Sequence, residues 1–128
     1  MNASQMRLES LTPAYAFEAV QDLLSLPRPP SAIMIGGNLM LAGALRALAL
    51  SGKIVPRDIS MIAVGDTDLA ELAHPSFTAV RWDLDRMGRE AASLLLNRLT
   101  GRTAEIAARP VMIGTEIVLR NSCRAITA

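Results

Sequence analysis

Short apolar runs that alternate with helical segments constrain the fold of this chain more than any other feature. The runs Ala32–Ile35 (AIMI) and Ile59–Val64 (ISMIAV) are almost continuously apolar, as expected of strands buried on both faces. A third run extends from Phe77 to Arg81 or Trp82, and the β-branched residues of Pro110–Leu119 indicate a further strand. Helical segments and short connections between these runs predict a parallel, Rossmann-like α/β sheet with helices on both faces.

Capping signals delimit the helical segments. Thr12 followed by Pro13 indicates a helix start, and Asn38 and Asp83 are predicted to cap later helices. Gly52 stands where helices commonly end. The predicted helices are Pro13–Leu26, Leu39–Ser51, a short piece at Asp68–Ala73, and Leu84–Leu99.

Composition excludes several classes of protein. The 13 Lys and Arg residues against 12 Asp and Glu give a net charge of +1, and their scatter argues against nucleic-acid binding by electrostatics alone. The single Cys123 cannot form an intrachain disulfide, and no apolar segment with a basic flank opens the sequence, so we expect a cytoplasmic protein. The apolar stretch Leu39–Leu50 is too short to span a bilayer. At 128 residues, 51% of them apolar, the chain is expected to fold as one unit.

Polar and aromatic residues follow the interior strands where each strand is predicted to end. These strand ends are Gly37-Asn38, Gly65-Asp66 and Trp82-Asp83. In parallel α/β sheets, ligands bind beyond the carboxyl ends of the strands, where the connections open a crevice. Glycines, an amide, two carboxylates and an indole ring suit a polar, partly apolar small molecule. The local pattern alone leaves Trp82 open as either a core residue or a ligand platform.

Residues that catalysis requires are sparse. His74 is the only histidine, Cys123 has no histidine near it in the sequence, and no G-x-S-x-G elbow is present. No pair of His, Cys or acidic residues has the spacing of metal ligands. Gly36, Gly37 and Gly43 fit neither common phosphate-binding loop, and they indicate a tight turn and close helix packing instead. We therefore expect no enzyme activity, no metal and no cofactor, since only the generic α/β sheet favours a small enzyme.

The helix predicted at Leu39–Ser51 is apolar nearly all round, because Arg46 is the only charged residue within it. Such a helix needs cover on more than its sheet side. A deep core position in a larger protein would provide that cover, and so would a subunit interface with a two-fold mate. In a domain of this size the interface is favoured.

Longer stretches of the chain resemble a known family. LAGALRAL, GKIVPRDIS, PSFTAVR and the terminal VLRNSC occur in an order and spacing that resembles the C-terminal part of the effector-binding domain of lactose/galactose-repressor (LacI/GalR) family transcription regulators. The resemblance covers Pro13 to Cys123. It implies a type I periplasmic-binding-protein-like fold of two Rossmann-like subdomains, with a sugar or related small effector between them. Residues 1–128 would be the C-terminal portion of that domain, without the helix-turn-helix and the N-terminal subdomain.

The resemblance also implies partners. Such regulators bind operator DNA as dimers through a helix-turn-helix, and effector binding shifts the subdomains and with them the DNA-binding state. The implied protein is a cytoplasmic, non-enzymatic homodimer that is independent of membranes. It would bind operator DNA only through a helix-turn-helix that this chain does not contain.

Particular positions follow from the family pattern. Asn38 stands where the family usually has an aspartate, so it keeps an acceptor, adds a donor and loses the charge. Asp66 is the acid kept from the family's GFDD run, and it could bind the effector or serve the turn. Trp82, where the family commonly has Gln, would suit stacking on a sugar ring. The resemblance implies effector contacts at Asn38, Asp66, Trp82 and Leu84, and dimer contacts at Ala42, Leu45 and Arg46.

A periplasmic sugar-binding protein of a transport system shares this fold and is the alternative function. The apolar helix at Leu39–Ser51 favours the dimeric regulator, because transport receptors are usually monomeric. A signal peptide in the complete reading frame would favour transport, and a helix-turn-helix would favour transcription regulation.

Overall fold

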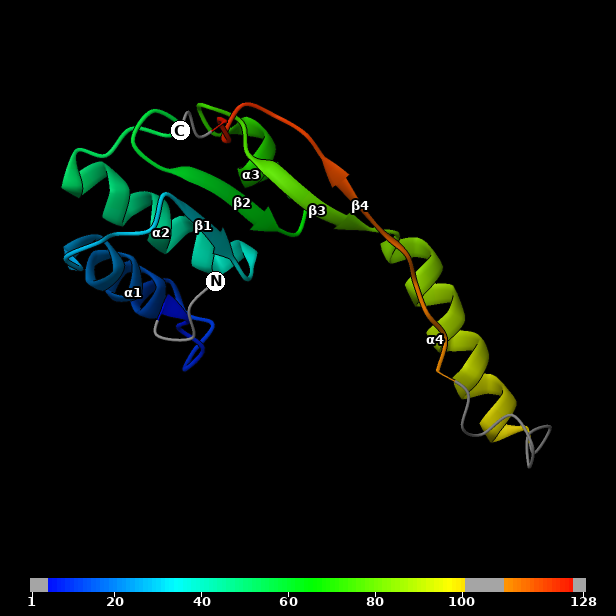
Figure 1. The fold of residues 1–128 in the computed structure, drawn as a ribbon. Coiled ribbons are helices and arrows are strands. Elements are labelled where there is room, and N and C mark those ends of the chain that lie inside the picture. Colours follow the sequence, from blue (N-terminus) through cyan, green and yellow to red (C-terminus); the bar gives the residue numbers. More distant parts are fainter. Residues whose placement is uncertain (1–4, 101–109, 126–128) are drawn as a thin grey trace. The chain divides into compact units, whose positions relative to one another are not determined.

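The computed structural model describes residues 5–100 and 110–125 of the chain, whose helices and strands follow one another as expected from the sequence (Figure 1). In chain order they are α1 (Pro13–Ser25), β1 (Ala32–Ile35), α2 (Asn38–Ser51), β2 (Ser60–Val64), α3 (Asp68–Leu72), β3 (Thr78–Trp82), α4 (Leu84–Leu99) and β4 (Thr115–Val118). They belong to two compact units. Unit 1 comprises Met1–Arg81 and Ile117–Ala128, and unit 2 comprises Trp82–Glu116.

The sheet has the strand order β1-β2-β3-β4, and its first three strands are parallel. Ile33 of β1 lies opposite Met61 of β2, and Ala63 of β2 lies opposite Ala79 of β3. All four of these side chains are buried, whereas Met34, which points to the opposite face, is 63% exposed. The predicted α/β class with a mostly parallel sheet and surrounding helices is confirmed.

The core of unit 1 lies between this buried sheet face and the helices α1 and α2, which lie side by side (Figure 1). Leu41, Ala44, Ala47 and Leu48 of α2 are almost fully buried. Helix α1 adds buried residues such as Val20, and it covers a second side of α2. Part of the all-round apolarity of α2 is therefore explained within the chain itself.

Several predicted helix ends are confirmed. Thr12 and Asp83 accept hydrogen bonds from backbone N–H groups in the first turns of α1 and α4, and Gly52 ends α2 with a left-handed φ of 66°. The prediction that Asn38 caps α2 is wrong. Gly37 occupies the cap position, and Asn38 is the first residue of the helix. Its side chain instead accepts a hydrogen bond from Thr67 in the loop after β2.

Other boundaries shift by one or a few residues. Helix α1 ends at Ser25 rather than Leu26, and α3 ends one residue before Ala73. The last strand occupies only Thr115–Val118 of the predicted Pro110–Leu119. No residue of α4 is buried among those described.

Gly43 permits the close approach of α1 and α2, as expected from the sequence. A Cβ atom at this position would overlap the carbonyl group of Pro13 at the start of α1, lying 2.8 Å from its carbonyl carbon. Backbone atoms cannot move aside as a flexible side chain can. The helices must therefore separate if any side chain is placed at Gly43.

Replacement of Gly43 by alanine is expected to lower the free energy of unfolding by about 1–3 kcal/mol, as overpacked core positions do. Urea denaturation followed by circular dichroism measures the change. Gly88→Ala is the control, because a Cβ at Gly88 would meet no atom within 4 Å. Equal stability of the two variants would contradict the close packing of α1 on α2.

Candidate effector site at the carboxyl ends of the strands

The loops after β1 and β2 meet through their side chains. Thr67, in the loop after β2, donates its hydroxyl hydrogen to Oδ1 of Asn38 over 2.9 Å. The Thr67 hydroxyl also accepts the N–H of Ala70 and so caps α3. The structure thus brings the predicted site residue Asn38 next to the segment that holds Asp66. Thr67 itself was not predicted, although a threonine three residues before a helical N–H is a recognisable capping signal.

Asp66 is held by arginines from two other segments. Its Oδ1 lies 2.6 Å from Nη1 of Arg120, and its Oδ2 lies 3.4 Å from Nη1 of Arg81. The Asp66 side chain is only 8% exposed, and that of Arg120 is 15% exposed. At such low exposure the attraction between the charges is screened little by water. Asp66 therefore has a structural role in its loop, and effector binding by Asp66 stays a prediction.

Arg120 also contacts groups other than the Asp66 carboxylate. Its guanidinium also donates to the backbone carbonyl of Phe77 over 3.0 Å and lies 3.6 Å from the carboxylate of Glu71. Its backbone N–H donates to Oγ1 of Thr78. The residue thereby joins the segment after β4 to α3, to the loop after β2 and to the start of β3. Sequence reasoning gave Arg120 no role, although it lies in the VLRNSC stretch that carried the family resemblance.

The remaining predicted effector residues belong to unit 2. Trp82 is the last residue of β3 and is half-buried, and Leu84 opens α4 and is 63% exposed. Asp83, between them, accepts the N–H of Arg86 and caps the helix as predicted. Effector binding by Trp82 and Leu84 stays a prediction.

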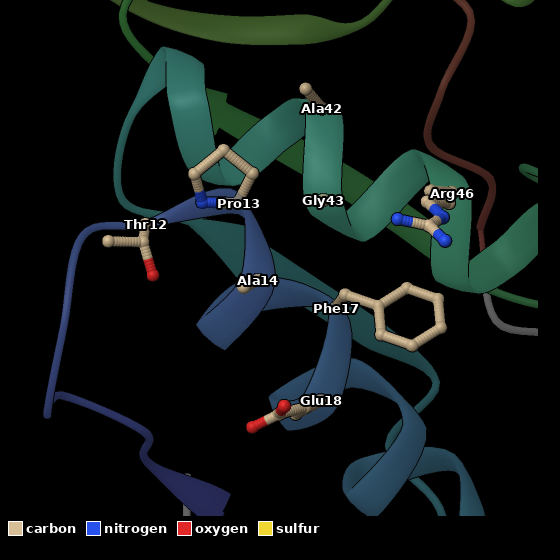
Figure 2. A pocket seen from close by; sticks show the side chains of 8 residues that line it. All are labelled: Thr12, Pro13, Ala14, Phe17, Glu18, Ala42, Gly43 and Arg46. Atoms are coloured by element: carbon tan, nitrogen blue, oxygen red, sulfur yellow. The ribbon is translucent and has the colours of Figure 1, made fainter.

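A hollow of about 560 Å³ lies between α1 and α2 and contains two of the three predicted dimer contacts (Figure 2). Ala42 and Arg46 line it from α2, whereas Leu45 is half-buried against the core. The Arg46 guanidinium lies 5.1 Å from the centroid of the Phe17 ring, a cation–π distance. Figure 2 shows the Phe17 ring extending from α1 toward the side of α2 that carries Arg46.

The residues considered for catalysis have ordinary surroundings. The His74 ring lies 3.0 Å from the carbonyl oxygen of Leu72, and Cys123 is an exposed free thiol whose Sγ lies 3.3 Å from the carbonyl oxygen of Met61. Within residues 5–100 and 110–125, no three His, Cys, Asp or Glu side chains are placed to hold a metal ion together. In the same ranges, no helix has the length and apolarity needed to cross a membrane.

Residues 2–123 match the family of periplasmic binding protein-like domains. The chain is 34% identical over 109 residues to the HTH-type transcriptional repressor CytR of Escherichia coli, a match that covers 85% of the chain and 31% of CytR. The crystal structure of the E. coli transcriptional repressor AscG superposes with a TM-score of 0.76 at 27% identity, over 98% of this chain and 44% of that one. A LacI family regulator from Arthrobacter, solved in complex with lactose, superposes with a TM-score of 0.72 at 32% identity, over 88% and 42% of the two chains.

These comparisons define the class of protein. The chain belongs to the periplasmic binding protein-like family, and it is recognised as part of the effector-binding domain of the LacI/GalR type. It spans about a third of the length of the curated relatives that it matches.

The Asp66–Arg120 pair gives a direct test of the structural role of Asp66. Asp66→Asn would leave the guanidinium of Arg120 largely buried without its main counter-charge, so we expect the free energy of unfolding to fall by about 2–4 kcal/mol. Chemical denaturation of both proteins measures the difference. Asp68→Asn, which removes an exposed acid two residues away, should cost less than about 1 kcal/mol. Equal losses in the two variants would show that the Arg120 contact contributes little.

Proposed function

We propose that this chain is the effector-binding and dimerisation segment of a LacI/GalR-type transcription regulator that responds to a sugar or related small molecule. The observation that carries the proposal is the contact of Asn38 with Thr67, which brings the loops after β1 and β2 together at the carboxyl ends of parallel strands. That edge is where sheets of this kind bind ligands. The relatives that match the chain are named as transcription regulators, and one structural neighbour was solved with lactose.

The wider activity follows the family pattern. Operator DNA would be bound by a helix-turn-helix in another part of the protein, and the regulator would work without enzyme activity in the cytoplasm, where the operator lies. Effector binding would shift the equilibrium between two arrangements of the domain and so change operator affinity. A transport receptor is set aside because the named relatives are regulators.

Trp82 provides a readout of effector binding. In the full-length protein, an effector that changes operator affinity is expected to shift or quench the emission of Trp82, because stacking on a sugar changes the environment of the indole ring. Trp82→Leu should weaken effector binding roughly threefold to tenfold, since aromatic stacking contributes about 0.5–1.5 kcal/mol.

Tryptophan emission spectra measure the first effect, and fluorescence anisotropy of labelled operator DNA over a sugar titration measures the second. Operator affinity in the absence of effector should be unchanged in the variant. If an effector alters operator binding but leaves the Trp82 emission unchanged, Trp82 does not face the effector. If no sugar or sugar derivative alters operator binding at all, the proposed function is wrong.

The hollow between α1 and α2 is proposed to be part of the dimer interface. Ala42 is an exposed, uncharged residue on its α2 side, and Ala14 and Phe17 continue the apolar surface on α1. Leu39 and Leu50, at the two ends of α2, are 63% and 67% exposed. Apolar area of this kind on one helix suits a self-complementary two-fold contact.

Ala42→Glu in the full-length protein is expected to favour the monomer. The added carboxylate would lie one turn from Arg46, but its burial in the interface still has a desolvation cost, so the dimer dissociation constant should rise roughly tenfold or more. Sedimentation velocity over a concentration series measures this constant. Gln21→Glu adds the same charge to an exposed position of α1 outside the hollow, and it should leave the dimer intact. A monomeric wild-type protein would exclude the proposed interface.

A further inference from the structure

The orientation of the Asn38 side chain is set by Thr67. The Thr67 hydroxyl accepts the N–H of Ala70 over 3.4 Å and donates its hydrogen to Oδ1 of Asn38 over 2.9 Å. A hydroxyl has one hydrogen to give, and this arrangement uses it. The opposite orientation of the amide would leave that hydrogen without its acceptor. One of the two lone pairs of the Asn38 oxygen is therefore engaged, whereas both hydrogens of its amide nitrogen can be offered to a ligand.

The nearest carboxylate is already engaged. Both oxygens of Asp66 contact guanidinium groups, and its side chain is 8% exposed. An effector hydroxyl that has to donate a hydrogen bond at this edge would compete with Arg120 for the Asp66 carboxylate. The side chain of Asn38, by contrast, is exposed. At the ends of β1 and β2 the structure thus offers a donor more readily than an acceptor.

Space for a ligand group lies beside Asn38. A hollow of about 210 Å³ is lined by Leu11, Gly36, Gly37, Asn38, Leu39 and Met40. A Cβ atom at Gly37 would meet no other atom within 4 Å, so the backbone there is open to approach. The amide of Asn38 is the only side-chain hydrogen-bonding group among these lining residues, and the rest of the lining is apolar or backbone. A single polar group on an apolar wall fixes the orientation of a ligand and selects its chemistry.

We infer that the effector presents a hydrogen-bond acceptor without hydrogens of its own, a carboxylate or carbonyl oxygen, to Nδ2 of Asn38. The inference rests on the proposed function and specifies its ligand class as sugar acids or acyl-substituted sugars rather than unmodified neutral sugars. A sugar hydroxyl can also accept a hydrogen bond from the amide, but a carboxylate forms a charge-assisted bond that is roughly twice as strong as a neutral one. Discrimination against unmodified sugars follows from this difference in strength.

Matched sugars test this inference in the full-length protein. D-Glucuronate and D-galacturonate differ from D-glucose and D-galactose by a carboxylate in place of a hydroxymethyl group, and N-acetyl-D-glucosamine supplies a carbonyl instead. Calorimetric titration should show that at least one uronate or the acetylated sugar binds roughly tenfold or more tightly than its parent sugar, as expected for a hydrogen bond to a charged or strongly polar acceptor. If a uronate is the tighter ligand, the group that contacts Asn38 is a carboxylate. If the acetylated sugar is the tighter ligand, that group is a carbonyl.

Variants of Asn38 connect the selectivity to its amide. N38D replaces the donor by a carboxylate of the same shape, so binding of the preferred sugar should weaken roughly tenfold or more. N121D makes the same substitution at an exposed residue whose backbone contacts Ser76, before β3, and should leave binding unchanged. T67V removes the hydroxyl that orients Asn38 and should reduce the preference over the parent sugar, whereas T67S should retain it.

The inference is overturned if the parent sugars bind as tightly as their derivatives, if N38D leaves binding unchanged, or if none of the acceptor-bearing sugars binds. These outcomes are separable from failure of the proposed function. If a neutral sugar alters operator binding, the proposed function stands while the Asn38 inference fails. If operator binding responds to no small molecule, both fail.

Discussion

The ion pair between Asp66 and Arg120 is the interaction on which the arrangement of unit 1 depends. Its two residues are 54 positions apart, and it ties the loop after β2 to the segment after β4. Two residues on, the buried hydroxyl of Ser122 donates to the carbonyl oxygen of Met61 and accepts the N–H of Thr78. The returning segment is thereby bonded to both β2 and β3. Because these groups are shielded from water, each bond is costly to break without a replacement.

Because arginines engage both oxygens of Asp66, its carboxylate is less available to a ligand at the strand ends. A carboxylate engaged by two arginines stabilises the loop that carries Thr67, and Thr67 in turn orients Asn38. The chemistry available to an effector is therefore set by a chain of contacts from Arg120 through the loop to Asn38. The structural acid and the amide that we propose to bind the effector would then have separate roles, although they lie in adjacent loops.

Much of the fold could be predicted from local pattern. The apolar runs placed β1 to β3 within one residue, and Thr12, Asp83 and Gly52 marked helix ends correctly, because caps act within a few residues of the chain. Asn38 failed as a cap for a related reason. The glycine before it takes the cap position, and the Asn38 side chain bonds to Thr67, which is 29 residues away. Local rules contain no information about such a partner.

The candidate site was predicted less completely than the fold. The topology places the loops of Asn38 and Asp66 at the carboxyl ends of neighbouring parallel strands, as predicted, whereas effector binding there stays a prediction. The role of Arg120 was not predicted because an arginine after a strand has no local signature. Its role becomes evident only from its contact with Asp66 in the folded chain. The apolarity of α2 indicated a need for cover, but the sequence did not show that α1 provides part of it, with Gly43 at the contact.

Hydrogen–deuterium exchange of the full-length protein tests the central claim most directly. The claim is that the effector binds at the carboxyl ends of β1 and β2, against Asn38 and the loop that Thr67 belongs to. With an effector that alters operator binding, amides in residues 36–40 and 65–68 should become more protected than in the free protein, because a bound ligand stabilises the loops that it contacts. Protection confined to the hollow between α1 and α2, with these two loops unchanged, would contradict the account.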